Sequence, residues 1–171
     1  EGTTVAGGNG DGSAANQLSF PRGIALDASG NMYIVDTGND RVQKQEAGAS
    51  EGTTVAGGNG DGSAANQLSN PAGIALDASG NLYIADTENH RIQKWAPGAS
   101  EGITVAGGNG KGSAANQLYY PTGITLDASG VSISGPTISI EGVNAEVKGT
   151  AALTLEASGV NTIKGATVMI N

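Results

Sequence analysis

The glycine-rich segment GGNGDGSAANQ, residues 7–17, carries the first side chains that could do chemistry. Asn9, Asp11 and Ser13 stand at alternate positions, as oxygen ligands do in a calcium loop, and the glycines suggest a phosphate-binding turn. A calcium site needs more carboxylates, and a phosphate loop needs a following helix or a Lys-Ser/Thr pair. A later copy of the segment also has Lys111 in place of the Asp. We therefore expect a structural connection and neither a metal nor a cofactor.

His90 is the only histidine of the chain, and there is no cysteine. One imidazole cannot complete a metal site alone, and a cluster of three around a symmetry axis would need residue 90 close to that axis. The sequence instead places it in a turn before a strand. We expect a surface histidine, with no thiolate ligand and no thiol nucleophile elsewhere.

Two oppositely charged pairs recur with one spacing, Asp36 with Arg41 and Asp86 with Arg91. Such pairs can serve catalysis, but these two occupy the same position of a repeated pattern. Recurrence in every copy favours a hydrogen-bonded tie between strands. The sequence predicts a structural role for all four residues, no catalytic residue and no enzymatic activity.

The composition narrows the possible folds and partners. The chain has 171 residues, 29 of them Gly, with 4% aromatic residues, which is thin material for a conventional core. A formal charge of −8 argues against nucleic acid and anionic membranes as partners. The chain starts at Glu1 in frame with its repeat, without Met, signal peptide or long apolar run, so we expect a processed or trimmed chain.

Internal repetition with a period of 50 residues is the dominant pattern. Residues 1–50 and 51–100 are identical at 40 of 50 positions, and a third copy runs from Glu101 to Gly130. The first two copies differ at positions 20, 22, 32, 35, 38, 40, 42, 45, 46 and 47. Within each copy GIALD, MYIVD or LYIAD, RVQKQ or RIQKW, and TTVAGG favour four short strands, hence one antiparallel sheet per copy.

The segments FPRGIALDASGNMYIVDTGNDRVQK and NPAGIALDASGNLYIADTENHRIQKW closely resemble the NHL repeat. The resemblance covers residues 1 to about 130 and implies an all-β fold, a β-propeller with one four-stranded blade per repeat. Closure of a propeller takes roughly four to eight blades. The strand order predicts two complete blades, a spare outer strand at residues 3–8 and an unfinished third blade.

Three aromatic residues stand apart from their counterparts in the other copies. Trp95 replaces Gln45, and we expect it to pack against a neighbouring blade; contact with a ligand is the alternative. Tyr119 and Tyr120 precede the point where the repeat stops. We expect them to pack where the two parts of the chain meet.

Residues 131–171 follow a different pattern, with short alternating segments separated by glycines and no aromatic residue. Such a segment cannot form a monomeric core, but three copies wound about an axis could bury the apolar side of each strand. The predicted trimer core is Val131, Ile133, Ile138, Ile140, Val143, Val147, Leu153, Leu155, Val168 and Ile170. LDASGVSISGPTISIEG and IKGATVMIN resemble the C-terminal trimeric β-helix of VgrG-type spikes of type VI secretion and phage tails.

The two resemblances together predict blades at residues 1–122 and a trimeric β-helix at 123–171. Three chains with two blades each would give a six-bladed ring across a homotrimer. ITLDASG fits both families at the join, which favours an engineered chimera with a structural, assembly role. The alternatives are an NHL-propeller binding module for protein or carbohydrate and a membrane-puncturing spike of an injection system. The spike resemblance implies a secreted, virion or injection-apparatus protein.

Overall fold

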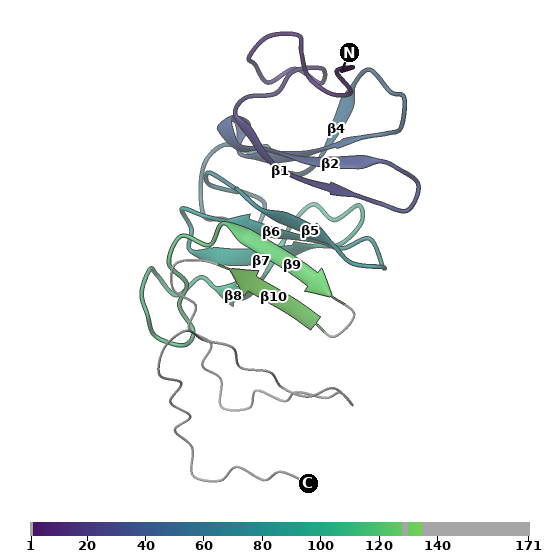
Figure 1. The fold of residues 1–171 in the computed structure, drawn as a ribbon. Coiled ribbons are helices and arrows are strands. Elements are labelled where there is room, and N and C mark those ends of the chain that lie inside the picture. Colours follow the sequence, from purple (N-terminus) through teal and green to yellow (C-terminus); the bar gives the residue numbers. More distant parts are fainter. Residues whose placement is uncertain (1, 128–129, 135–171) are drawn as a thin grey trace, which may run out of the picture.

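The computed structural model describes residues 2–127 and 130–134, and this part of the chain is all-β (Figure 1). Its only helical element is a short 3-10 turn, η1 (Thr37–Asn39). Most of the predicted trimer core lies outside the described residues, namely Ile138, Ile140, Val143, Val147, Leu153, Leu155, Val168 and Ile170. The backbone at Val131 and Ile133 is described, and the β-helix stays a prediction.

Two antiparallel four-stranded sheets form from residues 21–107, as predicted for two blades. The first blade, in sheet order, is β1 (Pro21–Leu26), β2 (Met32–Asp36), β3 (Arg41–Gln45) and β4 (Gly52–Gly57). The second blade is β5 (Ile74–Leu76), β6 (Leu82–Asp86), β7 (Arg91–Trp95) and β8 (Ile103–Gly107). Each blade therefore takes its fourth, outer strand from the copy that follows it.

Residues 2–20 form no strand in the described structure, although residues 3–8 were predicted as an outer strand. The equivalent segments β4 and β8 pair with the third strand of the preceding blade. Among residues 2–127 and 130–134 no strand pairs with residues 3–8. This prediction of a strand was wrong for the single chain.

The turns between the first and second strands are fixed by aspartate side chains. Asp27 accepts backbone N–H bonds from Ser29 and Asn31, both at 2.9 Å, and a bond from the Asn31 amide at 2.8 Å. The Asn31 amide, aided by these backbone donors, lowers the pKa of the Asp27 carboxyl. Asp77 and Asn81 repeat the arrangement. The ASGN sequence therefore stabilises each hairpin locally.

The third copy adds a hairpin of β9 (Gly123–Asp127) and β10 (Gly130–Ser134). β9 packs against β5 and β6, in the same way that β5 packs against β1 and β2 (Figure 1). The hairpin therefore occupies the place of the first two strands of a third blade, although the boundary between the two parts of the chain is predicted after residue 122. The boundary itself stays a prediction.

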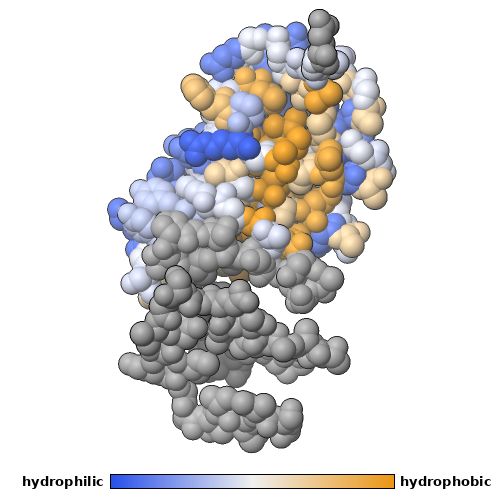
Figure 2. All heavy atoms as spheres, viewed as in Figure 1, coloured by the Kyte–Doolittle hydropathy of each residue, from blue (hydrophilic) through white to orange (hydrophobic). Residues whose placement is uncertain are grey.

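Hydrophobic side chains fill the spaces between successive blades. The cluster between the two sheets contains Val35, Val42, Ala56, Leu68, Ile74, Leu82, Ile84 and Trp95. A smaller cluster of Ala85, Ile92 and Leu118, with Ile124 packed on it, lies between the second blade and β9. Figure 2 shows a band of hydrophobic side chains crossing both blades on the side where β1 and β5 lie. Trp95 packs between blades, as predicted.

Glycine allows the first strands of successive blades to come into direct contact. A Cβ on Gly23 would lie 2.5 Å from the Ala72 carbonyl oxygen, and one on Gly73 would lie 2.5 Å from that of Thr122. Any larger residue would push the strands apart. The Pro-x-Gly-Ile pattern is thus a requirement of blade-to-blade packing.

Replacing Leu68 by Ala should lower the free energy of unfolding by about 2–5 kcal/mol, because the truncation leaves a cavity in a fully buried cluster. Urea denaturation followed by Trp95 fluorescence measures the loss. The matched control is Ile103→Ala, whose side chain is 70% exposed; it should change stability by less than about 0.5 kcal/mol. Equal losses in the two variants would contradict this account of the core.

Candidate functional site

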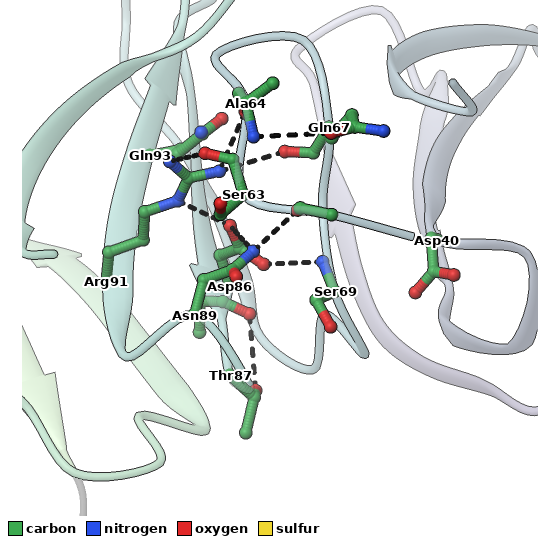
Figure 3. Close-up of polar contacts among 12 residues, drawn as sticks. Asp40, Ser63, Ala64, Gln67, Ser69, Asp86, Thr87, Asn89, Arg91 and Gln93 are labelled. Atoms are coloured by element: carbon green, nitrogen blue, oxygen red, sulfur yellow. Dashed lines mark hydrogen bonds and ion pairs between the residues drawn. The ribbon is translucent and has the colours of Figure 1, made fainter. Parts of the chain in front are cut away.

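The charged pair Asp86 and Arg91 ties a connecting loop to the second blade (Figure 3). Arg91 Nε donates to Asp86 Oδ2 at 2.6 Å across paired positions of β6 and β7. The two Nη atoms of Arg91 donate to three carbonyls of the loop, those of Ser63 at 2.8 Å and of Ala64 and Gln67 at 3.0 Å. One guanidinium thus fastens the loop that leads into its own blade.

The Asp86 carboxylate completes this network. It accepts the Ser69 backbone N–H at 2.7 Å on Oδ1, and the Asn89 amide at 2.9 Å on Oδ2, so both oxygens are satisfied. Burial raises the pKa of Asp86 above its ordinary value, and the bonds from Ser69, Asn89 and Arg91 act in the opposite direction. The side chain is fully buried, so nothing in solution can reach it.

Asp36 and Arg41 build the same tie in the first blade. Arg41 Nε donates to Asp36 at 2.7 Å, and the guanidinium also reaches the carbonyls of Ser13, Ala14 and Gln17. We call each Asp–Arg pair with the loop carbonyls that it holds a loop clamp. The structure brings all four predicted residues together in two buried pairs, in the geometry of a structural tie.

The glycine-rich loops use their polar groups internally. Asn9 Nδ2 donates to the Asn16 carbonyl at 3.0 Å, and Gln17 Nε2 donates to the Asn9 carbonyl at 2.9 Å. Asp11 forms an isolated bridge with Leu18. Within the described residues there is no group of three or more metal-ligating side chains.

A groove of about 620 Å³ lies where the two blades meet. Its walls come from the loop ahead of the first strand of each blade and from the turn after the second strand. The lining residues are Phe20, Pro21, Arg22, Thr37, Gly38, Asp40, Asp61, Ser69, Asn70 and Glu88. Four of the ten positions that differ between the first two copies, positions 20, 22, 38 and 40, contribute to it. The groove therefore combines residues that are not equivalent between the two copies.

Asp40 is the most constrained charge in the groove. Its Oδ1 accepts the Asn70 backbone N–H at 2.8 Å, which links the first blade to the loop of the second. The pKa of Asp40 lies above its ordinary value, chiefly because the carboxyl is partly buried and also because Asp61 and Asp86 are near. The bond from Asn70 acts in the opposite direction. The groove thus has three acidic residues, Asp40, Asp61 and Glu88, against one cation, Arg22.

His90 takes the place of Asp40 in the second blade. Its Nδ1 accepts the Tyr120 backbone N–H at 3.2 Å, and its ring lies edge to face with Tyr120 at 4.5 Å between centroids. The side chain is 9% exposed, so the prediction of a surface histidine was wrong. The sequence did not predict that His90 would accept a hydrogen bond from the next loop. The one signal for it was that His90 occupies the position of Asp40 in the repeat. Tyr119 and Tyr120 pack on the second blade.

Comparison with known proteins identifies the repeats. Residues 18–44 and 68–95 match the NHL repeat. Each matched segment begins at a leucine of the connecting loop, Leu18 or Leu68, and runs through the first three strands of one blade. Together with the two four-stranded sheets, the match indicates β-propeller blades. No curated protein matches the chain. The resemblance of residues 123–171 to VgrG-type spikes stays a prediction.

The described residues contain no helix that could cross a membrane.

Replacing Arg91 by Ala should destabilise the protein by about 3–5 kcal/mol, because Asp86 would be left buried without its partner. The double variant Asp86→Leu/Arg91→Met should recover only part of this loss, because it removes the unpaired charge but leaves the Ser69 N–H and the loop carbonyls without partners. Lys44→Ala is the control, since its partner Glu46 is 73% exposed and lies 3.5 Å away, so the pair should contribute less than about 1 kcal/mol. Chemical denaturation of the four proteins gives the comparison. A mild effect of Arg91→Ala would show that the clamp is dispensable.

Proposed function

We propose that the chain is a non-enzymatic assembly module, in which NHL blades from three chains close one six-bladed propeller. Residues 123–171 form a trimeric β-helix that holds the three chains together. The buried loop clamps support a structural role, because the hydrogen-bonding groups of the recurring Asp–Arg pairs bind each other and the loop carbonyls. The proposal includes no catalytic residue and no cofactor.

The unequal exposure of equivalent residues in the two blades carries this proposal. Ile24 in β1 is 59% exposed, whereas Ile74, at the same position of β5, is 8% exposed. The first blade covers Ile74, and nothing within the described chain covers Ile24. Leu26 and Phe20 are also exposed on the first blade. An apolar blade face of this kind is stable when another blade covers it.

The number of complete blades favours three chains. Each chain closes two blades, and six is a permitted number of blades for a propeller ring. A sixfold ring contains a threefold axis, so a threefold β-helix can share that axis. The alternating apolar residues of 131–171 support such a helix, because buried strands of this pattern need partner chains.

The mass of the particle in solution tests the proposal. Light scattering on a size-exclusion column should give three times the mass of one chain. Leu153→Asp with Leu155→Asp should abolish the trimer, because unpaired charges in its core are costly, and the blades should then aggregate or unfold. The control is Ala152→Asp with Thr154→Asp, at the alternate positions, which should remain trimeric. A monomeric parent protein, or a well-folded monomer from the leucine variant, would refute the proposal.

A second candidate function is binding of a protein through the groove between blades, as the NHL repeats suggest. The observation in its favour is that non-equivalent residues of the two copies gather there. The acidic excess of Asp40, Asp61 and Glu88 suits a basic segment. An envelope-puncturing spike, the third class, would depend on the tail, most of which lies outside the described residues.

The groove can be tested with synthetic peptides of opposite charge. A lysine-rich peptide should bind the parent protein, and Glu88→Gln should weaken that binding and its dependence on salt. A glutamate-rich peptide should not bind. Glu51→Gln, which removes a charge outside the groove, is the control. Equal binding of the two variants would exclude the groove as the site.

A further inference from the structure

We infer that residues 2–20, here called the N-terminal arm, close the second blade of another copy of this chain. In doing so they take the place that residues 102–120 occupy in the single chain. This inference rests on the proposed assembly and identifies the segment that joins one chain to the next. The occupant of the open blade edge is a second copy, because the chain already contains the same joint.

The arm is nearly a duplicate of the segment that it would replace. Residues 2–20 and 102–120 differ at four positions, Thr3 against Ile103, Asp11 against Lys111, Ser19 against Tyr119 and Phe20 against Tyr120. Ile103 and Lys111 are both exposed, and the Tyr120 group that bonds His90 is its backbone N–H, which Phe20 also has. The arm therefore has the side chains needed to form the outer strand and the loop of a second blade.

The copy at residues 52–70 shows what such a segment does when both neighbours are present. Its strand, β4, pairs with β3 of the preceding blade. Its loop is held by Arg91 of the following blade. Leu68 lies between the two blades and is fully buried. One segment thus staples two successive blades together.

The arm has only half of these partners in the single chain. Arg41 holds its loop, but no strand of the described residues pairs with residues 3–8, and Val5 is 64% exposed. Leu18 is half-buried, whereas Leu68 and Leu118 are 0% and 3% exposed. The missing neighbour is a blade with the surface that Ala85 and Ile92 present around Leu118. The second blade of another chain has that surface.

Only one segment can occupy that blade edge. Successive first strands touch closely enough that a Cβ on Gly73 would lie 2.5 Å from the Thr122 carbonyl oxygen. An incoming β1 takes the place of β9, so the loop that leads into β9 must leave with it. The Gly108 N–H also bonds the His90 carbonyl at 3.0 Å, and Gly8 is its equivalent in the arm. The two loops therefore compete for the same acceptor.

The loop clamp decides this competition. Asp36 and Arg41 hold the loop of the arm in the conformation that the blade joint uses. The corresponding positions after residues 102–120 are Pro136 and Glu141, which cannot form an Asp–Arg pair. The arm thus arrives already ordered, whereas residues 108–120 lack this support. Because the two strands are almost identical, the ordered loop should determine which segment stays bound.

Engineered cysteines can distinguish the two arrangements, because the natural chain has none. Lys94 of β7 faces Ile103 of β8, and Thr3 is the equivalent of Ile103 in the arm. Facing residues in antiparallel strands have Cβ atoms about 4.5–5.5 Å apart, within reach of disulfide formation after small adjustments. The two variants are Thr3→Cys/Lys94→Cys and Ile103→Cys/Lys94→Cys, each oxidised as the purified full chain.

We expect Thr3→Cys/Lys94→Cys to give covalent trimers on a non-reducing gel, and Ile103→Cys/Lys94→Cys to give no intrachain bond by peptide mapping. Ala6→Cys/Lys94→Cys, which is out of register, is the control for random collision. An intrachain bond from Ile103 within a particle of trimer mass would overturn the inference and leave the proposed assembly standing. A monomer mass for the unmodified protein would overturn both.

A matched pair of leucine variants gives an independent measurement. In the Thr3→Cys/Lys94→Cys background, Leu18→Asp should abolish the disulfide between chains, because Leu18 becomes buried against the partner's second blade. Leu118→Asp should leave that disulfide intact, because residues 102–120 are released from that blade. Loss of the disulfide in Leu118→Asp with retention in Leu18→Asp would overturn the inference.

Discussion

A four-stranded blade has two faces, and the packing of this chain follows from the need to cover both. The space between the blades contains most of the buried hydrophobic residues, including Leu68 and Trp95. Glycines such as Gly73 bring the first strands of neighbouring blades into contact. Each blade therefore depends on its neighbours for its core, and a chain with two complete blades presents an open face at β1.

The loop clamps hold the segments that link each blade to the next one along the chain. Each connecting segment gives its strand to one blade and its loop to the next, and the Asp–Arg pair fixes the loop. The polar network lies under the loops, where carbonyls would otherwise be left without donors. The Asp–Arg pairs, which could suggest catalysis when the sequence is read alone, therefore form buried structural hydrogen bonds.

Assembly and binding use different parts of the blades. The faces that pack blade on blade are mainly apolar in both copies, although four of the ten differing positions, 32, 35, 42 and 45, lie in their strands. The groove at the blade ends is polar, and it combines Phe20, Arg22 and Asp40 of one blade with Asn70 and Glu88 of the next. The substitutions in the packing faces are mostly between apolar residues, whereas those in the groove change charge and polarity, as in Asp40 against His90 and Gly38 against Glu88.

The amino-acid sequence by itself determined the strands, the turns and the number of complete blades, because alternation and the Asp-x-x-Gly-Asn turn act within a few residues. It also identified Asp36, Arg41, Asp86 and Arg91 as structural pairs. Only the tertiary structure placed the Ser63–Gln67 carbonyls around Arg91, buried His90 against Tyr120 and left residues 3–8 without a strand partner. These features depend on contacts between segments 24 to 30 positions apart or on a neighbouring blade, which local patterns do not encode.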